Sequence, residues 1–234
     1  MAQIDTGASF PVDSVACLDL SRKKRCGVPE VVLAEGKHPD HLLSIVQSYV
    51  HSAGRCIVSR IDPDSASKLM EWADAENISG EYSEVGRILV FAVAPPPAET
   101  GGKVGILTAG TSDIRVGEEA RIIAEEMGCQ VRTAYDIGVA GIHRVFPAIS
   151  EMTDYHAFVV AAGREGTLPS IVAGLTDRPV IGVPVSTGYG YMGEGQAALA
   201  SMLQSCSVLT VVNIDAGFVA GAYAALIANL VMRK

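Results

Sequence analysis

Four residues of this sequence have reactive side chains and are expected to lie in loops or at helix ends. Asp113 and Glu165 are carboxylates, His143 is an imidazole and Cys206 is a thiol. The first three are the titratable groups of loops that we expect at one sheet edge, where they could act as acid, base or metal ligand. Cys206 stands in a polar Gln-Ser-Cys-Ser run, where it is either a nucleophile or a structural thiol, and its spacing alone favours the structural role.

Each of the other three has an ordinary alternative. Asp113 could cap the helix that follows it, a role that is compatible with chemistry. His143 could hydrogen-bond the start of a helix and do nothing else. Glu165 lies in Gly-Arg-Glu-Gly, where a side chain has little to pack against, and this favours a functional role.

Four glycine-bearing loops surround these groups, at residues 110–113, 136–144, 163–169 and 186–195. Backbone amides of such loops, next to helix N-termini, are typical phosphate donors. The last loop, rich in Tyr and Gly, would either cover a nucleotide or be a solvated turn. The predicted substrate-binding residues are Gly110, Thr111, Ser112, Arg144, Gly163, Gly166, Ser186, Gly188, Tyr189 and Gly190.

Regular alternation of apolar strands and amphipathic helices predicts the scaffold that gathers these loops. Strands are expected near 104–109, 130–134, 156–162, 179–184 and 208–213, and helices near 113–127, 143–152, 168–175, 195–205 and 217–232. Five strands alternating with five helices imply a parallel sheet covered on both faces. The predicted fold is a flavodoxin-like, doubly wound α/β domain of three layers, whose strands deliver their loops to one edge.

A smaller α/β domain is expected to precede it. Residues 30–34, 55–60 and 87–94 read as strands, with helices opening at Pro39 and Pro63. Pro95-Pro96-Pro97 stops the sheet because proline cannot donate to a ladder. The predicted organisation is a flexible segment at 1–18, a small domain at 19–94, a linker at 95–102 and a catalytic domain at 103–234.

Composition excludes several classes of protein. The net charge of −8 argues against a nucleic-acid partner, which needs a basic face. Five cysteines without framework spacing indicate reduced thiols and a cytoplasmic location. The apolar stretch 216–232 is slightly short for a membrane span and reads as a buried helix whose small residues permit close approach, within or between subunits.

The rim loops resemble those of the aminoimidazole ribonucleotide (AIR) carboxylases and mutases of purine synthesis. Residues 110–113 are similar to their Gly-Ser-Ser-Asp loop, and Ile142-His143-Arg144 is similar to the Ala-His-Arg that supplies their catalytic histidine. Residues 163–185 resemble the loop, helix and strand that follow. This likeness covers only the second domain.

A closer resemblance, to the LarB family, covers nearly the whole chain. Its motifs occur in order: Asp19-x-x-Arg22-x-x-Arg25 with Gly27 and Pro29-Glu30-Val31, Glu35-Gly36-Lys37, TAGTSD at 108–113, YDIGVAGIHR at 135–144, and Ser205-Cys206 before VVNIDAGF at 211–218. The resemblance implies a pyridinium-3,5-biscarboxylic acid mononucleotide synthase of nickel-pincer nucleotide synthesis. Such an enzyme carboxylates nicotinic acid adenine dinucleotide with CO2 or bicarbonate, then hydrolyses its phosphoanhydride and releases AMP. It further implies Mg²⁺, for which Glu165 is a candidate ligand, and a homo-oligomer, with an octamer as the expected form, acting without a membrane.

The chemistry implied by this resemblance gives Cys206 a reason to be reactive. A pyridinium ring is electron-poor, so its C5 cannot attack CO2 until a nucleophile adds at C4 and makes C5 enamine-like. Cys206 matches the position of the family's catalytic cysteine, which would make it that nucleophile. Asp113 and His143 are then candidates for proton transfer and ring positioning, and Glu165 for deprotonation, hydrolysis or a cation. The alternatives are a purine-type AIR carboxylase or mutase, which would not need the cysteine, and a non-catalytic nucleotide- or flavin-binding module.

Overall fold

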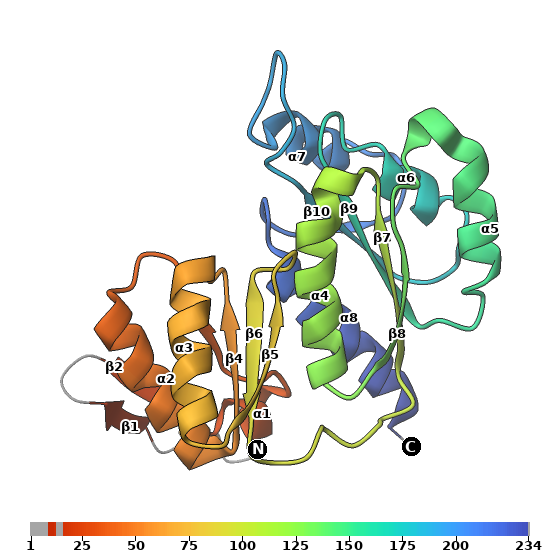
Figure 1. The fold of residues 1–234 in the computed structure, drawn as a ribbon. Coiled ribbons are helices and arrows are strands. Elements are labelled where there is room, and N and C mark those ends of the chain that lie inside the picture. Colours follow the sequence, from red (N-terminus) through yellow and green to blue (C-terminus); the bar gives the residue numbers. More distant parts are fainter. Residues whose placement is uncertain (1–8, 13–15, 234) are drawn as a thin grey trace. The chain divides into compact units, whose positions relative to one another are not determined.

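The chain forms two compact units, residues 1–96 and 97–234, which are described separately. The structure is a computed structural model that describes residues 9–12 and 16–233 (Figure 1). The division falls inside the proline-rich segment 95–102. Residues 1–8 and 13–15 of the segment expected to be flexible lie outside the described residues.

The larger unit contains the predicted five-stranded sheet. Its strands lie in the order β11-β10-β9-β7-β8 and all pair in parallel, namely β7 (Lys103–Thr108), β8 (Gln130–Ala134), β9 (Ala157–Ala162), β10 (Val180–Pro184) and β11 (Thr210–Val211). This is the flavodoxin-like doubly wound order, which confirms the predicted fold class. β11 is shorter than the expected 208–213 because only Thr210 and Val211 pair with β10.

Helices cover both faces of this sheet, as the alternating pattern predicted. The helices α4 (Ile114–Glu126) and α8 (Gly217–Met232) pack on one face, and α5 (Val145–Ser150), α6 (Leu168–Ala173) and α7 (Gln196–Leu203) pack on the other. Short 3₁₀ turns, Thr111–Asp113 and Val139–Arg144, precede α4 and α5. Strand β9 is buried along its whole length, as expected for a central strand covered on both faces.

Helices α4 and α8 approach each other closely because glycine stands at their crossing. A Cβ on Gly221 would lie 2.4 Å from the Ala120 carbonyl oxygen and 2.8 Å from the Ala120 Cα. Since both atoms are backbone, neither can move aside without moving α4. One face of the apolar segment 216–232 is therefore buried against α4 at a distance that small residues allow. The other face is exposed, with Val219, Tyr223, Leu230, Val231 and Met232 at its surface.

We expect Gly221→Ala to lower the stability of the larger unit. Alanine is the better helix former by up to about 1 kcal/mol, but the backbone clash outweighs this gain, and we expect a net loss of about 1–3 kcal/mol in the free energy of unfolding. Urea unfolding measures it. Gly174→Ala is the matched control, because its added Cβ would come no closer than 3.4 Å to any atom. Equal stability of the two variants would contradict the packing account.

The smaller unit has a four-stranded sheet in the order β3-β4-β6-β5, of which β5 was not predicted. Its strands are β3 (Val31–Leu33), β4 (Arg55–Ser59), β5 (Ser79–Ser83) and β6 (Ile88–Ala92), and its longer helices are α2 (Pro39–Ala53) and α3 (Pro63–Ala75). The sequence SGEYS of β5 lacks an apolar stripe and becomes a strand through its antiparallel pairing with β6. Tertiary pairing overrides weak propensity here.

Part of the segment 1–18, which was expected to be flexible, has regular secondary structure. The strands β1 (Ser9–Val12) and β2 (Ala16–Asp19) form an antiparallel ribbon, and helix α1 (Arg22–Cys26) follows. Val12 and Leu18 pack into the core of the smaller unit. Those two side chains supply the apolar burial that holds the ribbon in place.

The basic residues of the N-terminal motif contact their own unit. Arg22 pairs with Glu30 at 3.0 Å, Arg25 pairs with Asp19, and the Lys37 ammonium donates to the Leu33 carbonyl oxygen at 2.6 Å. In the described part of the chain, no helix has the length and apolar character that a membrane crossing requires.

Candidate active site

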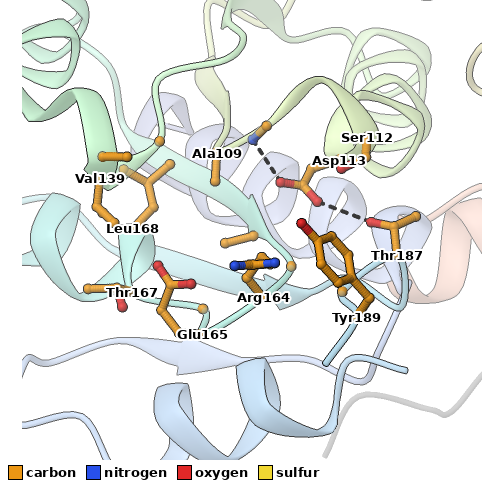
Figure 2. Close-up of a pocket in the computed structure, with 17 residues that line it drawn as sticks. Ala109, Ser112, Asp113, Val139, Arg164, Glu165, Thr167, Leu168, Thr187 and Tyr189 are labelled. Carbon is orange, nitrogen blue, oxygen red and sulfur yellow. Dashed lines mark hydrogen bonds between the residues drawn. The ribbon is translucent and has the colours of Figure 1, made fainter. Parts of the chain in front are cut away.

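A pocket of about 320 Å³ opens at the carboxyl ends of the parallel strands of the larger unit (Figure 2). Its walls come from four segments that are distant in sequence. They are residues 109–113 without Thr111, residues 138–140, residues 162–168 and residues 187–189. The parallel sheet brings them together, because the residues after β7, β8, β9 and β10 all leave the same edge.

The predicted site residues divide between the pocket and its surroundings. The pocket is lined by Gly110, Ser112, Asp113, Gly163, Glu165, Gly166, Gly188 and Tyr189. It is not lined by Thr111, His143, Arg144, Ser186, Gly190 or Cys206. Within one protomer, two of the four reactive side chains therefore share a cavity, and both are carboxylates.

Asp113 is the buried acid of the pocket, with 3% of its surface exposed. As the N-cap residue of α4 it makes no side-chain capping bond, but its carboxylate accepts from the N-cap Gly110 of the 3₁₀ turn that runs into α4. Oδ2 accepts the Gly110 N–H at 2.8 Å, and the Thr187 hydroxyl lies 3.5 Å from Oδ1 (Figure 2). Burial raises the pKa of Asp113, and the backbone N–H groups of Gly110 and Gly163 offset only part of this rise. A carboxyl group with a raised pKa is suited to proton transfer.

The raised pKa of Asp113 predicts how the stability of the protein changes with pH. A carboxyl whose folded-state pKa exceeds its unfolded value of 3.8 favours folding below that value, and this contribution disappears as the pH rises through the folded-state pKa. Relative to Asp113→Asn, the unchanged protein should therefore lose stability on that pH rise. Urea unfolding of both proteins at a series of pH values measures the difference. A constant difference across the range, or one that favours the unchanged protein at higher pH, would contradict the buried acid.

Arg164 and Tyr189 also line the pocket. The Arg164 guanidinium lies over the Tyr189 ring, 4.4 Å from its centroid, in a cation–π arrangement (Figure 2). Arg164 has φ 45°, a left-handed conformation that non-glycine residues seldom adopt and that often marks functional sites. Arg164 was not among the predicted site residues, although it stands beside Glu165 in a loop that was singled out.

Glycines allow the loops to approach one another here. A Cβ on Gly188 would lie 2.8 Å from the Arg164 backbone nitrogen, and one on Gly163 would lie 3.2 Å from Asp113 Oδ1 and 3.4 Å from the Gly188 nitrogen. The loops after β7, β9 and β10 are therefore in van der Waals contact. The predicted glycines at 163 and 188 have a steric function: they keep the pocket walls close together.

His143 and Arg144 lie outside the pocket, in the exposed turn before α5. Arg144 pairs with Asp136 at 2.7 Å, which joins the two ends of the loop after β8. That loop reaches the pocket instead through Gly138, Val139 and Ala140.

Cys206 is exposed and lies in the turn between α7 and β11. It precedes a strand that runs parallel to β10, so it lies towards the amino ends of the strands, whereas the pocket lies at their carboxyl ends. The residues on either side of Cys206 form hydrogen bonds with α6. The Ser170 hydroxyl donates to Ser205 Oγ at 2.8 Å, and the Ser207 hydroxyl donates to the Ser170 carbonyl oxygen at 2.8 Å. A single protomer therefore keeps this thiol apart from the pocket carboxylates.

The two pocket carboxylates are also the candidate ligands for a metal ion. The described residues contain no group of three or more His, Cys, Asp or Glu side chains arranged to hold a metal ion. Mg²⁺, however, commonly uses one or two carboxylates together with substrate phosphates and water. The oxygens of Asp113 face backbone N–H groups and Thr187, so Glu165 is the pocket carboxylate that fits this role.

Comparisons with known proteins agree with this division of the chain. Residues 103–233 match the family model described as AIR carboxylase, and residues 11–93 match the one described as LarB/PurE-like N-terminal domain. "Uncharacterized protein MJ0165" of Methanocaldococcus jannaschii is 43% identical over 91% of this chain and 84% of its own length. An N5-carboxyaminoimidazole ribonucleotide mutase of the same organism is 32% identical over 48% of this chain and 69% of its own length. A probable mutase of that type from Methanothermobacter thermautotrophicus is 31% identical over 55% of this chain but only 38% of its own length.

The match to AIR carboxylase spans nearly all of the larger unit, and the match to the second family model spans most of the smaller one. The chain therefore belongs to a LarB-like family, in which a LarB/PurE-like N-terminal domain precedes an AIR carboxylase-like domain.

Proposed function

We propose that this protein carboxylates nicotinic acid adenine dinucleotide at C5 of the pyridinium ring and then hydrolyses the phosphoanhydride. The coarser function is that of an enzyme of the AIR carboxylase type. The observation that supports the finer one is the LarB/PurE-like domain at residues 11–93, in the same chain as a carboxylase domain whose pocket is lined by two carboxylates. The relatives with purine-mutase names match only about half of this chain or less in the cases described above.

The proposed reaction balances without an oxidant or a reductant. The Cys206 thiolate adds its electron pair to C4 of the ring, which becomes a dihydropyridine with a nucleophilic C5. C5 then attacks CO2 to form the new carbon–carbon bond. A base removes the C5 proton, and the electron pair of the C4–S bond returns to sulfur as the ring regains aromaticity. Water then cleaves the phosphoanhydride, leaving the dicarboxylated mononucleotide and AMP.

The side chains of the pocket suit specific steps of this proposed reaction. The raised pKa of Asp113 suits it to accept the C5 proton and then release it to water. The Arg164 guanidinium can pair with a substrate carboxylate or phosphate while Tyr189 offers a ring face for stacking. Gly110 and Ser112 lie beside the start of α4, a position that favours an anion. Mg²⁺, held by Glu165 and the phosphates, would neutralise charge during hydrolysis.

The proposed role of Cys206 requires a second copy of the chain. Since the thiol and the pocket are apart within one protomer, a homo-oligomer must bring the thiol of one copy to the pocket of another. The side chains near Cys206 favour such contact: Leu203 is 66% exposed and Val208 is 95% exposed. Apolar side chains so placed are typical of surfaces that become buried on association.

A substrate comparison tests this function. The protein is incubated with bicarbonate, Mg²⁺ and either nicotinic acid adenine dinucleotide or aminoimidazole ribonucleotide, and the products are separated and weighed. We expect turnover of the dinucleotide alone. Turnover of aminoimidazole ribonucleotide with an unchanged dinucleotide would instead establish the purine-type reaction, which the pocket and the mutase relatives make the second candidate.

A further inference from the structure

Asp215 is a partly buried carboxylate behind the pocket wall, in the turn between β11 and α8. Its side chain is 18% exposed. The backbone has φ 55°, in the left-handed region, which aspartate tolerates better than most residues. The Asp215 N–H donates to the Pro184 carbonyl oxygen at 2.9 Å, at the end of β10. The backbone therefore holds this residue in a strained conformation right beside the strand from which the loop 186–195 departs.

The Asp215 carboxylate joins two other elements. Oδ1 accepts the Ser186 N–H at 3.0 Å, and Oδ2 accepts the Ser186 hydroxyl. Oδ2 also lies 3.0 Å from Nη2 of Arg115, in the first turn of α4. Burial by itself would raise the pKa of Asp215, but the hydrogen bonds from Ser186 and the charge of Arg115 outweigh it, and the pKa lies below its ordinary value. Asp215 is therefore ionised at neutral pH and makes charge-assisted bonds, which are the stronger kind.

These contacts act on the pocket through the chain that follows Ser186. Thr187, Gly188 and Tyr189 line the pocket directly after it. Their position is narrowly limited, because Gly188 packs against the Arg164 backbone. The Thr187 hydroxyl, in turn, reaches Asp113 at the long distance of 3.5 Å. A shift of a few tenths of an ångström at Ser186 would change both contacts.

We propose that Asp215 is a positioning residue, which fastens Ser186 to helices α4 and α8 and so sets the distance between the Thr187–Tyr189 wall and Asp113. Asp215 does not line the pocket; it acts on the pocket wall through its bonds to Ser186 and pairs with Arg115 of α4. Its effect on turnover rests on the proposed function. The fastening itself is a property of the unliganded protein and is tested without substrate.

Proteolysis of the loop measures the fastening. Tyr189 and Tyr191 are exposed and offer chymotrypsin sites within it. Removing a charge-assisted hydrogen bond should increase local opening, so we expect cleavage at these tyrosines to become about tenfold faster in Asp215→Ala and less so in Ser186→Ala. Asp154→Asn is the matched control, since it removes the pair with Lys103 elsewhere in the same unit.

Two outcomes of this experiment would overturn the proposal. One is cleavage of both variants at the rate of the control. The other is faster cleavage that only follows a fall in global melting temperature. Ser186→Ala keeps the backbone bond to Asp215 and is expected to fold even if Asp215→Ala does not, so the test remains decisive.

The pKa of Asp113 gives a second readout that a purely structural residue would not change. The other charged side chains of the pocket are Arg164 and Glu165, and the Asp215–Arg115 pair lies behind it. Burial raises the pKa of Asp113, and the hydrogen bond from Thr187 lowers it. Ser186→Ala keeps the charge of Asp215 but loosens the chain that holds Thr187, so we expect this pKa, followed by carbon NMR of the carboxyl, to rise further. An unchanged or lower pKa would contradict the positioning.

Discussion

Cys206→Ser is expected to abolish carboxylation of nicotinic acid adenine dinucleotide, with a loss on the order of 10³-fold or more in kcat. A serine hydroxyl keeps the size of the side chain but does not form an anion near neutral pH, so it cannot add to C4 of the ring. Without that addition C5 remains electron-poor, and no other group in the pocket can change this. The rate of formation of the carboxylated product, measured by mass, gives the result.

Cys26→Ser is the matched control for this variant. Cys26 is also an exposed free thiol, but it lies in α1 of the smaller unit, where it donates to the backbone oxygens of Arg22 and Val28. We expect it to keep full activity. Equal activity of Cys206→Ser and Cys26→Ser would end the covalent mechanism, while leaving the fold and the pocket as described.

Asp113→Asn is expected to lower kcat by about 10²- to 10⁴-fold, the usual contribution of a general acid or base. The amide retains the shape of the carboxylate and can still accept the Gly110 N–H, but it cannot take a proton from C5. Binding of the dinucleotide should change much less than kcat, because the other pocket walls are intact. A loss confined to KM would show that Asp113 only binds the substrate.

A mixture of the two inactive variants tests whether one active site contains residues from two copies of the chain. If the thiol and the pocket belong to different copies, a mixed oligomer of Cys206→Ser and Asp113→Asn contains some sites with both residues intact. Co-refolded mixtures should then recover activity that neither variant has alone. No recovery, in an oligomer shown by mass to contain both chains, would contradict assembly from two copies.

The fold of the larger unit was predictable because its signals are local and repeated. Buried runs such as 157–162 can only be central strands, and each is followed by an amphipathic stretch of helical period. The shared edge of the strands then placed Asp113 and Glu165 in one cavity without any knowledge of contacts. Strand β5 and the ribbon of β1 and β2 were missed, since these segments are short, β5 is also polar, and each becomes a strand only through its pairing partner.

The site was predictable only in part, because side-chain contacts across loops leave no pattern in the sequence. Ser186 was expected to bind substrate, yet both its hydroxyl and its N–H bond Asp215. Asp215 itself stands in the motif at 211–218, but nothing in the spacing showed that its partner would be 29 residues away. The end of the sheet at which Cys206 lies follows from the direction of β11. Because Cys206 precedes this strand, which runs parallel to β10, it lies at the end away from the pocket.

The most direct test of the proposed function uses ¹³C-labelled bicarbonate with nicotinic acid adenine dinucleotide, Mg²⁺ and the assembled protein. We predict one labelled carboxyl at C5 of a pyridinium mononucleotide, seen by carbon NMR, together with one equivalent of AMP. Unlabelled dinucleotide recovered intact, or AMP released without label in the ring, would contradict the account.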